Sequence, residues 1–226
     1  MSGREDRALV VLSGGQDSTT CLYWAIDRFG RANVSSVTFD YGQKHRIELQ
    51  CARDVAAEAG ISNVCLPIDT FAALGGDALT DASIAVSDEA DAETQLPVTF
   101  VPGRNLVFLT FAAAYAYRHG ARHIVTGVAQ TDFSGYPDCR EETMAALQKA
   151  ITLGMDREFT IHTPLMHRSK KETVELAVRL GALDAMALTH TCYNGRRPPC
   201  GACQACRLRA RGFAEAGVRD PLLEIQ

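Results

Sequence analysis

The sequence lacks both an apolar run long enough to cross a membrane and an excess of basic charge. Its longest apolar stretch, residues 106–117, is interrupted by Thr110 and is well short of the ~18 residues that a membrane span requires. With 23 Lys and Arg against 27 Asp and Glu, the formal net charge is -4, which argues against a protein built mainly to coat nucleic acid. No secretory signal precedes the first strand pattern, so we expect a cytoplasmic protein whose eight cysteines are thiols or metal ligands.

A Walker-type nucleotide loop is also absent, and a different glycine-rich loop stands near the N-terminus. Residues 13–18 read Ser-Gly-Gly-Gln-Asp-Ser, between an apolar strand pattern at 8–12 and a helix pattern at 19–29. Two glycines let backbone N–H groups surround an anion, and a helix N-terminus adds donors and partial positive charge. The loop predicts an oxyanion cradle in which Asp17 holds Mg²⁺; the alternative is an ordinary turn capped by Asp17 or Ser18.

Strand and helix patterns alternate along the chain, which predicts an α/β fold with a Rossmann-like parallel sheet flanked by helices. We expect Asn105 to cap one helix and Ser169 with Glu172 to form a capping box for another. Residues 74–99 break the pattern and form either a solvated loop or a lid. The expected strands are 8–12, 34–40, 63–68, 123–128 and 160–164, and the expected helices are 19–29, 43–59, 105–119, 141–153 and 169–180.

Four cysteines lie close together near the C-terminus in the pattern Cys-x7-Cys-x2-Cys-x2-Cys. Four thiolates complete a tetrahedral shell, which predicts a structural zinc knuckle, with an iron–sulfur cluster as the competing interpretation. We expect residues 189–226 to form this zinc-binding subdomain, packed on a nucleotide-binding domain of residues 1–188. The predicted ligands are Cys192, Cys200, Cys203 and Cys206.

The remaining cysteines and the arginines near the cluster admit simpler interpretations. Cys21, Cys51 and Cys65 are predicted to be buried apolar residues. The arginines form either a phosphate- or RNA-binding patch or an offset for the charge of a tetrathiolate site. They are Arg196, Arg197, Arg207, Arg209 and Arg211.

Several stretches, taken in order, resemble one family: the 7-cyano-7-deazaguanine synthases of queuosine biosynthesis, within the PP-loop ATP pyrophosphatase superfamily. They are Leu-Ser-Gly-Gly-Gln-Asp-Ser at 12–18, Phe-Asp-Tyr-Gly-Gln at 39–43, Val-Pro-Gly-Arg-Asn at 101–105, Gly-Tyr-Pro-Asp-Cys-Arg at 135–140, and the four-cysteine tail. The resemblance implies a ligase that converts 7-carboxy-7-deazaguanine and ammonia to the nitrile, through adenylated intermediates and an amide. It also implies ATP with Mg²⁺, one structural Zn²⁺ per chain, and a homodimer.

The resemblance assigns roles by position. Tyr136, Asp138 and Arg140 would recognise the deazaguanine and its carboxylate. Asp17 and Asp132 would serve the reacting groups. Arg104 and Lys170 stand at helix starts, where a cation is unfavourable without a partner, so they are predicted to serve them too; the alternative for Lys170 is a solvated lysine. His45 with Glu48 would either aid proton transfer or form a surface helix pair. The ATP-binding residues would be Leu12, Ser13, Gly14, Gly15, Gln16, Asp17, Ser18, Thr19, Thr20, Cys21, Leu22, Phe39, Asp40 and Tyr41.

Three competing functions remain open at this stage. A tRNA-modifying PP-loop enzyme with an iron–sulfur cluster would explain the basic tail, but it predicts an RNA-binding domain that 226 residues barely allow. A non-enzymatic zinc-ribbon module would bind nucleic acid or a protein. A synthetase making a simple amide is the third; because no glutamine-hydrolysing domain is evident, free ammonia is the expected nitrogen source.

Overall fold

The structure is a computed structural model that describes residues 6–81, 83–87, 94–130 and 136–224. The predicted site residue Asp132 lies outside the described residues, as does the acidic part of the predicted loop at 88–93. Within the described ranges, no helix is long and apolar enough to cross a membrane.

A parallel sheet of five strands forms the centre of the protein, in the order β3-β2-β1-β4-β5. This confirms the predicted Rossmann-like α/β fold. Because side chains alternate along a strand, Leu9 of the central strand enters one core while Ala8 and Val10 enter the other. The strands are β1 (Ala8–Val11), β2 (Val34–Asp40), β3 (Asn63–Pro67), β4 (His123–Val125) and β5 (Thr160–His162).

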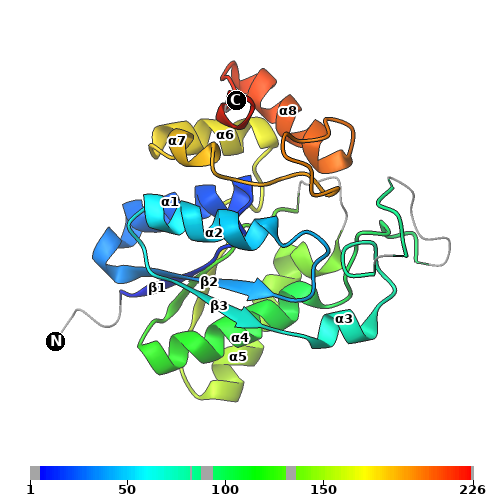
Figure 1. Cartoon of the computed structure of the whole chain (residues 1–226). Coiled ribbons are helices and arrows are strands. Elements are labelled where there is room, and N and C mark those ends of the chain that lie inside the picture. Colours follow the sequence, from blue (N-terminus) through cyan, green and yellow to red (C-terminus); the bar gives the residue numbers. More distant parts are fainter. Residues whose placement is uncertain (1–5, 82, 88–93, 131–135, 225–226) are drawn as a thin grey trace.

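Helices cover both faces of the sheet (Figure 1). On one face, α4 (Arg104–His119) packs on β1 and β4, and α5 (Glu141–Met155) packs on β5. On the opposite face lie α1 (Gln16–Phe29) and α2 (Ile47–Glu58). Both strand faces are therefore buried, as the apolar strand pattern predicts.

A further layer of helices lies beyond α1, at the top of Figure 1. In this layer α6 (Lys170–Arg179) packs on α1, α7 (Leu183–Met186) follows it, and α8 (Gln204–Ala216) packs on α6. A Cβ on Gly212 of α8 would lie 2.9 Å from the Lys170 Cβ, so glycine permits this close approach. The C-terminal segment thus packs on the body of the protein, and the boundary at residue 188 stays a prediction. Shorter helices are η1 (Arg31–Asn33), α3 (Thr70–Leu74), η2 (Pro137–Cys139) and η3 (Pro221–Leu223).

Three local predictions were wrong and one was confirmed. Asn105 does not cap α4: Gly103, in the left-handed region at φ 71°, precedes it, and Arg104 is the first helical residue. Helix α2 begins at Ile47 rather than at residue 43, so His45 precedes the helix and forms no helix pair with Glu48. Cys65 is exposed because β3 is an edge strand. The Ser169–Glu172 capping box is present as predicted.

Two histidines pair between β4 and β5, with His162 Nε2 lying 3.1 Å from His123 Nδ1. Both rings pack against Phe29, and His162 also packs against Trp24. Burial, together with the neighbouring His123, lowers the pKa of His162 from 6.5 to about 4. Between about pH 4 and pH 6.5, His162 is therefore neutral in the folded protein and protonated in the unfolded chain.

The pair predicts a loss of stability in mild acid. Since the unfolded state binds more protons below its pKa, the free energy of unfolding falls as pH drops from 6.5 toward 4. Between pH 7 and pH 5, we expect the free energy of unfolding to fall by about 1 kcal/mol less in His162→Gln than in the wild type, a figure that allows for the partial exposure of the side chain. Urea unfolding at several pH values measures it, with His167→Gln at an exposed position as the control. An unchanged slope in His162→Gln would contradict the assignment.

Candidate active site

A cavity of about 310 Å³ opens at the carboxyl ends of the central strands. The sheet order places β2 on one side of β1 and β4 on the other, and ligands of open α/β sheets bind at such a reversal. Ser13, which follows β1, and Gly127, which follows β4, both line the cavity. A Cβ on Gly127 would lie 3.0 Å from the Ser18 amide nitrogen, so this glycine lets the two loops meet.

The loop between β1 and α1 has a shape that requires glycine. Gly14 has φ 84°, and a Cβ there would lie 2.5 Å from the Glu48 carbonyl oxygen. The Ser18 hydroxyl donates to the Gly15 carbonyl at 3.1 Å and accepts from the Ser13 amide at 3.2 Å, which fixes the turn. Gly15 is the N-cap and no side chain caps the helix, so the predicted alternative of an Asp17 or Ser18 cap is wrong. The first turn of α1 keeps donors available for a ligand.

Asp17 and Lys170 meet across the mouth of this loop. The Lys170 Nζ donates to Asp17 Oδ2 at 2.7 Å, joining the first turn of α1 to the first residue of α6. The other carboxylate oxygen, Asp17 Oδ1, is buried without a hydrogen-bond partner among the described residues, as is the Gln16 Nε2. An unpartnered carboxylate oxygen beside a loop of N–H and hydroxyl donors fits Mg²⁺ bound with a polyphosphate.

Arg104 and Glu48 lie on the neighbouring side of the cavity. The Arg104 Nη1 donates to the Tyr41 hydroxyl at 3.3 Å, and the guanidinium stands 5.7 Å from the Tyr41 ring centre. Burial raises the pKa of Tyr41 to about 12, so its phenol stays protonated. Burial also raises the pKa of Glu48 to about 7, although Arg104 opposes the shift.

The structure brings most of the predicted ATP-loop and reacting groups to this cavity. It does not bring all of the predicted substrate contacts there. Asp138 is buried and accepts a hydrogen bond from the Asn105 backbone amide at 3.0 Å, so it anchors the start of α4, while Arg140 precedes α5 and is exposed. The predicted residues that line the cavity are Leu12, Ser13, Gly15, Gln16, Asp17, Ser18, Phe39, Tyr41, His45, Glu48, Arg104, Tyr136 and Lys170.

The cysteine-rich segment supplies a wall of the same cavity, which the sequence reasoning missed. Tyr193 and Gln204 both line the cavity, and each stands next to a cysteine of the cluster. The His190 amide donates to the Gly14 carbonyl at 2.9 Å, and the His190 ring bonds the Cys192 carbonyl at 2.9 Å. The spacing of the cysteines predicts a metal site, but it does not mark Tyr193 or Gln204 as residues that face a ligand.

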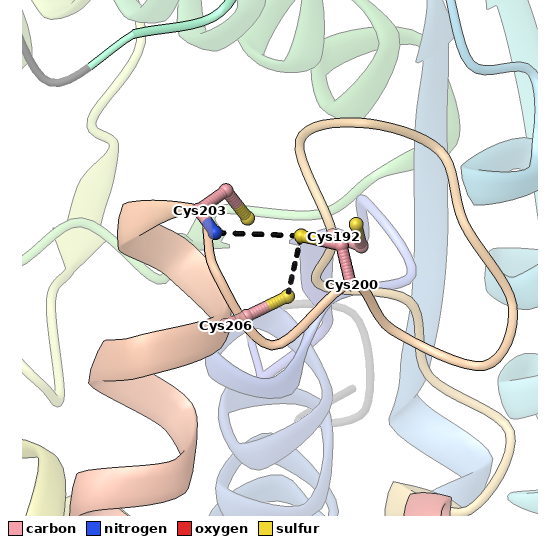
Figure 2. A group of neighbouring side chains, drawn as sticks. All are labelled: Cys192, Cys200, Cys203 and Cys206. Atoms are coloured by element: carbon pink, nitrogen blue, oxygen red, sulfur yellow. Dashed lines mark hydrogen bonds between the residues drawn. The ribbon is translucent and has the colours of Figure 1, made fainter.

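The four clustered cysteines form a candidate metal centre (Figure 2). Their sulfur atoms all lie within 4.8 Å of one another, with Cys200 Sγ and Cys206 Sγ 3.9 Å apart. Backbone N–H groups of Cys203 and Ala202 lower the pKa of Cys200 to about 5, which favours the thiolate. Four sulfurs at these separations fit a tetrahedral ion such as Zn²⁺.

Two of the arginines near the cluster, Arg197 and Arg209, are engaged within the protein. Arg197 donates to the Cys51 sulfur at 3.3 Å and to the Ala187 carbonyl at 3.0 Å, which ties the cysteine loop to α2. Arg209 is 3% exposed and makes a two-pronged ion pair with Asp220, at 2.6 and 2.7 Å. These contacts give both side chains a structural role in the packing of the C-terminal segment.

Arg209→Met is expected to destabilise the protein by roughly 3 kcal/mol or more, because it leaves the Asp220 charge buried and unpaired. Urea unfolding measures the change, and Arg219→Met, at a highly exposed arginine, is the control. Unaltered stability combined with weaker binding to heparin would contradict this and favour the phosphate-binding interpretation.

The family model for queuosine biosynthesis protein QueC matches residues 7–217 of the chain. The chain belongs to the QueC family. A relative from Chromobacterium violaceum, a 7-cyano-7-deazaguanine synthase, is 68% identical over 220 residues, covering 97% of this chain and 94% of its own. The 7-cyano-7-deazaguanine synthase of Laribacter hongkongensis is 64% identical over 218 residues, covering 96% and 94%. That of Lysinibacillus sphaericus is 50% identical over 214 residues, covering 94% and 96%.

Among solved structures, a predicted subunit of a tRNA methyltransferase from Methanocaldococcus jannaschii is similar, with a TM-score of 0.50. It is 18% identical and covers 76% of this QueC-family chain and 74% of its own. At this identity the likeness shows a shared fold and nothing further.

Proposed function

We propose that the chain is an ATP-dependent carbon–nitrogen ligase, a 7-cyano-7-deazaguanine synthase. It would convert 7-carboxy-7-deazaguanine and ammonia to the nitrile in the synthesis of the queuosine precursor. The observation that carries the proposal is the glycine loop with its Asp17–Lys170 pair, which faces a cavity in a chain of the QueC family.

The proposed chemistry proceeds by two adenylations. A carboxylate oxygen of the substrate attacks the α-phosphorus of ATP and pyrophosphate leaves. Ammonia then bonds to the acyl carbon and AMP leaves with the oxygen, giving an amide. The amide oxygen is adenylated in turn, and loss of AMP and of the N–H protons leaves the nitrile.

The chain's own residues would bind and orient the reactants. The loop N–H groups, the Ser13 and Ser18 hydroxyls and Lys170 would hold the phosphates, because they present donors around one cavity. Asp17 would hold Mg²⁺, which when bound spreads the charge that develops on the pyrophosphate. Leu12 and the strand end at Phe39 would contact the adenine.

The deazaguanine would lie toward the opposite wall. Tyr136, held by a 2.6 Å hydrogen bond to Thr99, and the knuckle residues Tyr193 and Gln204 offer aromatic faces and an amide there. Arg104 would pair with the substrate carboxylate. Direct contacts by Asp138 and Arg140 stay predictions, since neither side chain lines the cavity.

The zinc knuckle, the homodimer and the cytoplasmic location belong to the same proposal. Cys192, Cys200, Cys203 and Cys206 would hold one structural Zn²⁺ per chain. Light scattering of the purified protein tests the dimer, and metal analysis tests the zinc.

The reaction itself is tested with purified protein, Mg²⁺-ATP, ammonium and 7-carboxy-7-deazaguanine, with each component omitted in turn, followed by mass spectrometry. We expect nitrile, AMP and pyrophosphate only in the complete mixture. Accumulation of the amide without nitrile would show that the protein is an amide synthetase and does not form the nitrile. Absence of AMP would overturn the proposal.

A further inference from the structure

Glu48 is a cavity-lining carboxylate that the proposed binding roles above do not use, although its sequence position left proton transfer open as a role. It is the second residue of α2, and its backbone carbonyl packs directly against the glycine loop, so its position is fixed relative to that loop. Among the described carboxylates that line the cavity, Asp17 is paired with Lys170, whereas no described donor bonds to the Glu48 carboxylate. The Glu48 carboxylate is therefore available to a ligand in the cavity.

The groups around Glu48 keep it from being permanently charged. The positive charge of Arg104 on α4 favours the ionised form of the Glu48 carboxylate, but burial favours the protonated form more strongly. Its charge also acts on the protonated phenol of Tyr41 and on the Cys51 thiol one turn along α2. The loop residues Lys44 and His45 line the same cavity. With its pKa raised by burial to about 7, Glu48 exchanges protons near neutral pH, where a general base is most effective.

We infer that Glu48 is the acid–base residue that accepts protons from nitrogen during ammonia incorporation; this rests on the proposed function. When ammonia bonds to the activated acyl carbon, nitrogen carries a positive charge and must lose a proton before AMP departs. The Glu48 carboxylate takes that proton, the C–N bond remains, and the C–O bond to AMP breaks with its electron pair on oxygen. In the second stage it takes an N–H proton as the nitrile forms.

Other described side chains in the cavity are less suited to this role. The Tyr41 phenol is already protonated at neutral pH because burial raises its pKa to about 12. The His190 ring is bonded to the Cys192 carbonyl. His45 lies against the cysteine loop, where a Cβ on Gly195 would stand 2.1 Å from its Nδ1.

The test uses the metal-loaded full chain and the variant Glu48→Gln, with Glu58→Gln at the exposed end of α2 as the matched control. The rate of amide formation is measured against pH at a fixed concentration of free ammonia, and the pyrophosphate released in the first turnover reports adenylation separately. We expect the wild-type rate to fall about tenfold per pH unit below pH 7. In Glu48→Gln this pH dependence should be absent, and the rate at neutral pH should be lower by about 10²-fold. Adenylation should stay within about threefold of wild type, because its chemistry needs no base.

A second nucleophile separates a chemical role from a structural one. Methoxyamine is a free, weakly basic amine at neutral pH and loses its proton readily after attack, so it needs little help from a base. We therefore expect Glu48→Gln to lose far more rate with ammonia than with methoxyamine, whereas damage to the cavity would lower both equally. If Glu48→Gln does not fold, Glu48→Asp is judged by the same ratio of the two rates.

Two results would overturn the inference in distinguishable ways. An active wild type with an unchanged pH profile and nucleophile ratio in the variant would remove the role of Glu48 and leave the proposed function standing. A folded, metal-loaded wild type that releases no AMP would overturn both.

Discussion

Replacing Asp17 by asparagine is expected to lower kcat/KM for ATP-dependent product formation by about 10³-fold. The change keeps the side-chain volume but removes the negative charge from the start of α1. It removes the charge that pairs with Lys170 at 2.7 Å, and the amide NH2 must replace either the Oδ2 that accepts from Lys170 or the unpartnered Oδ1. Both the proposed Mg²⁺ contact and the placement of the lysine are therefore lost together.

Asp27→Asn is the matched control, because Asp27 lies on the same helix but is exposed. Its kinetics should equal those of the wild type. The double variant Asp17→Asn/Lys170→Met separates two roles for Asp17. If Asp17 only positioned Lys170, the double variant would be no slower than Lys170→Met alone; a further loss shows that Asp17 acts on the nucleotide itself. Wild-type kcat/KM in Asp17→Asn would contradict the placement of the nucleotide site.

Replacing Cys203 by serine is expected to release the bound metal and to lower activity by more than tenfold, although no cysteine of the cluster is assigned to the chemistry. The physical reason is the connection through His190, whose amide holds the Gly14 carbonyl while its ring holds the Cys192 carbonyl. Without the metal, four buried or half-buried thiols lose their common partner. The cysteine segment should then be less rigid, and the glycine loop that it contacts through His190 should be less well ordered.

Metal content, the thermal midpoint and the affinity for ATP should fall together in Cys203→Ser. Cys65→Ser is the control, since Cys65 is exposed on the edge strand and distant in sequence from the cluster. The absorption spectrum also separates zinc from an iron–sulfur cluster, which absorbs visible light. A metal-free Cys203→Ser protein with wild-type ATP affinity would contradict the link between the cysteine cluster and the loop.

The sheet could be predicted from the sequence because its signals are local. Short apolar runs ended by glycine mark the strands and helices, and the Ser169–Glu172 capping box marks the start of α6 within the chain itself. The glycine loop was equally recognisable, since a strand, two glycines and a helix are consecutive. The boundary of α2 was missed because residues 43–46 are used in the cavity and in contacts with the cysteine loop.

The opposite wall of the cavity could not be predicted because it depends on contacts distant in sequence. The local sequence around Gln204 does not indicate that α8 packs on α6, or that Gln204 and the preceding loop residue Tyr193 line the cavity. Likewise, the family resemblance predicted a substrate contact for Asp138, while tertiary packing supplies a backbone amide that donates a hydrogen bond to its carboxylate. The pairing of Asp17 with Lys170 joins residues 153 positions apart and was not predicted; the position of Lys170 in a helix first turn predicted only a phosphate contact.

The measurement that tests the central claim most directly follows the oxygen of the substrate carboxylate. The wild-type protein is incubated with Mg²⁺-ATP, ammonium and 7-carboxy-7-deazaguanine labelled with ¹⁸O in its carboxylate. The ¹⁸O content of the nucleotide products and of the nitrile is then measured by mass spectrometry. Adenylation predicts AMP that carries ¹⁸O and a nitrile that carries none. Unlabelled AMP, or ADP with labelled phosphate, would contradict the account, because the oxygen would then have left by a route that does not pass through an acyl adenylate.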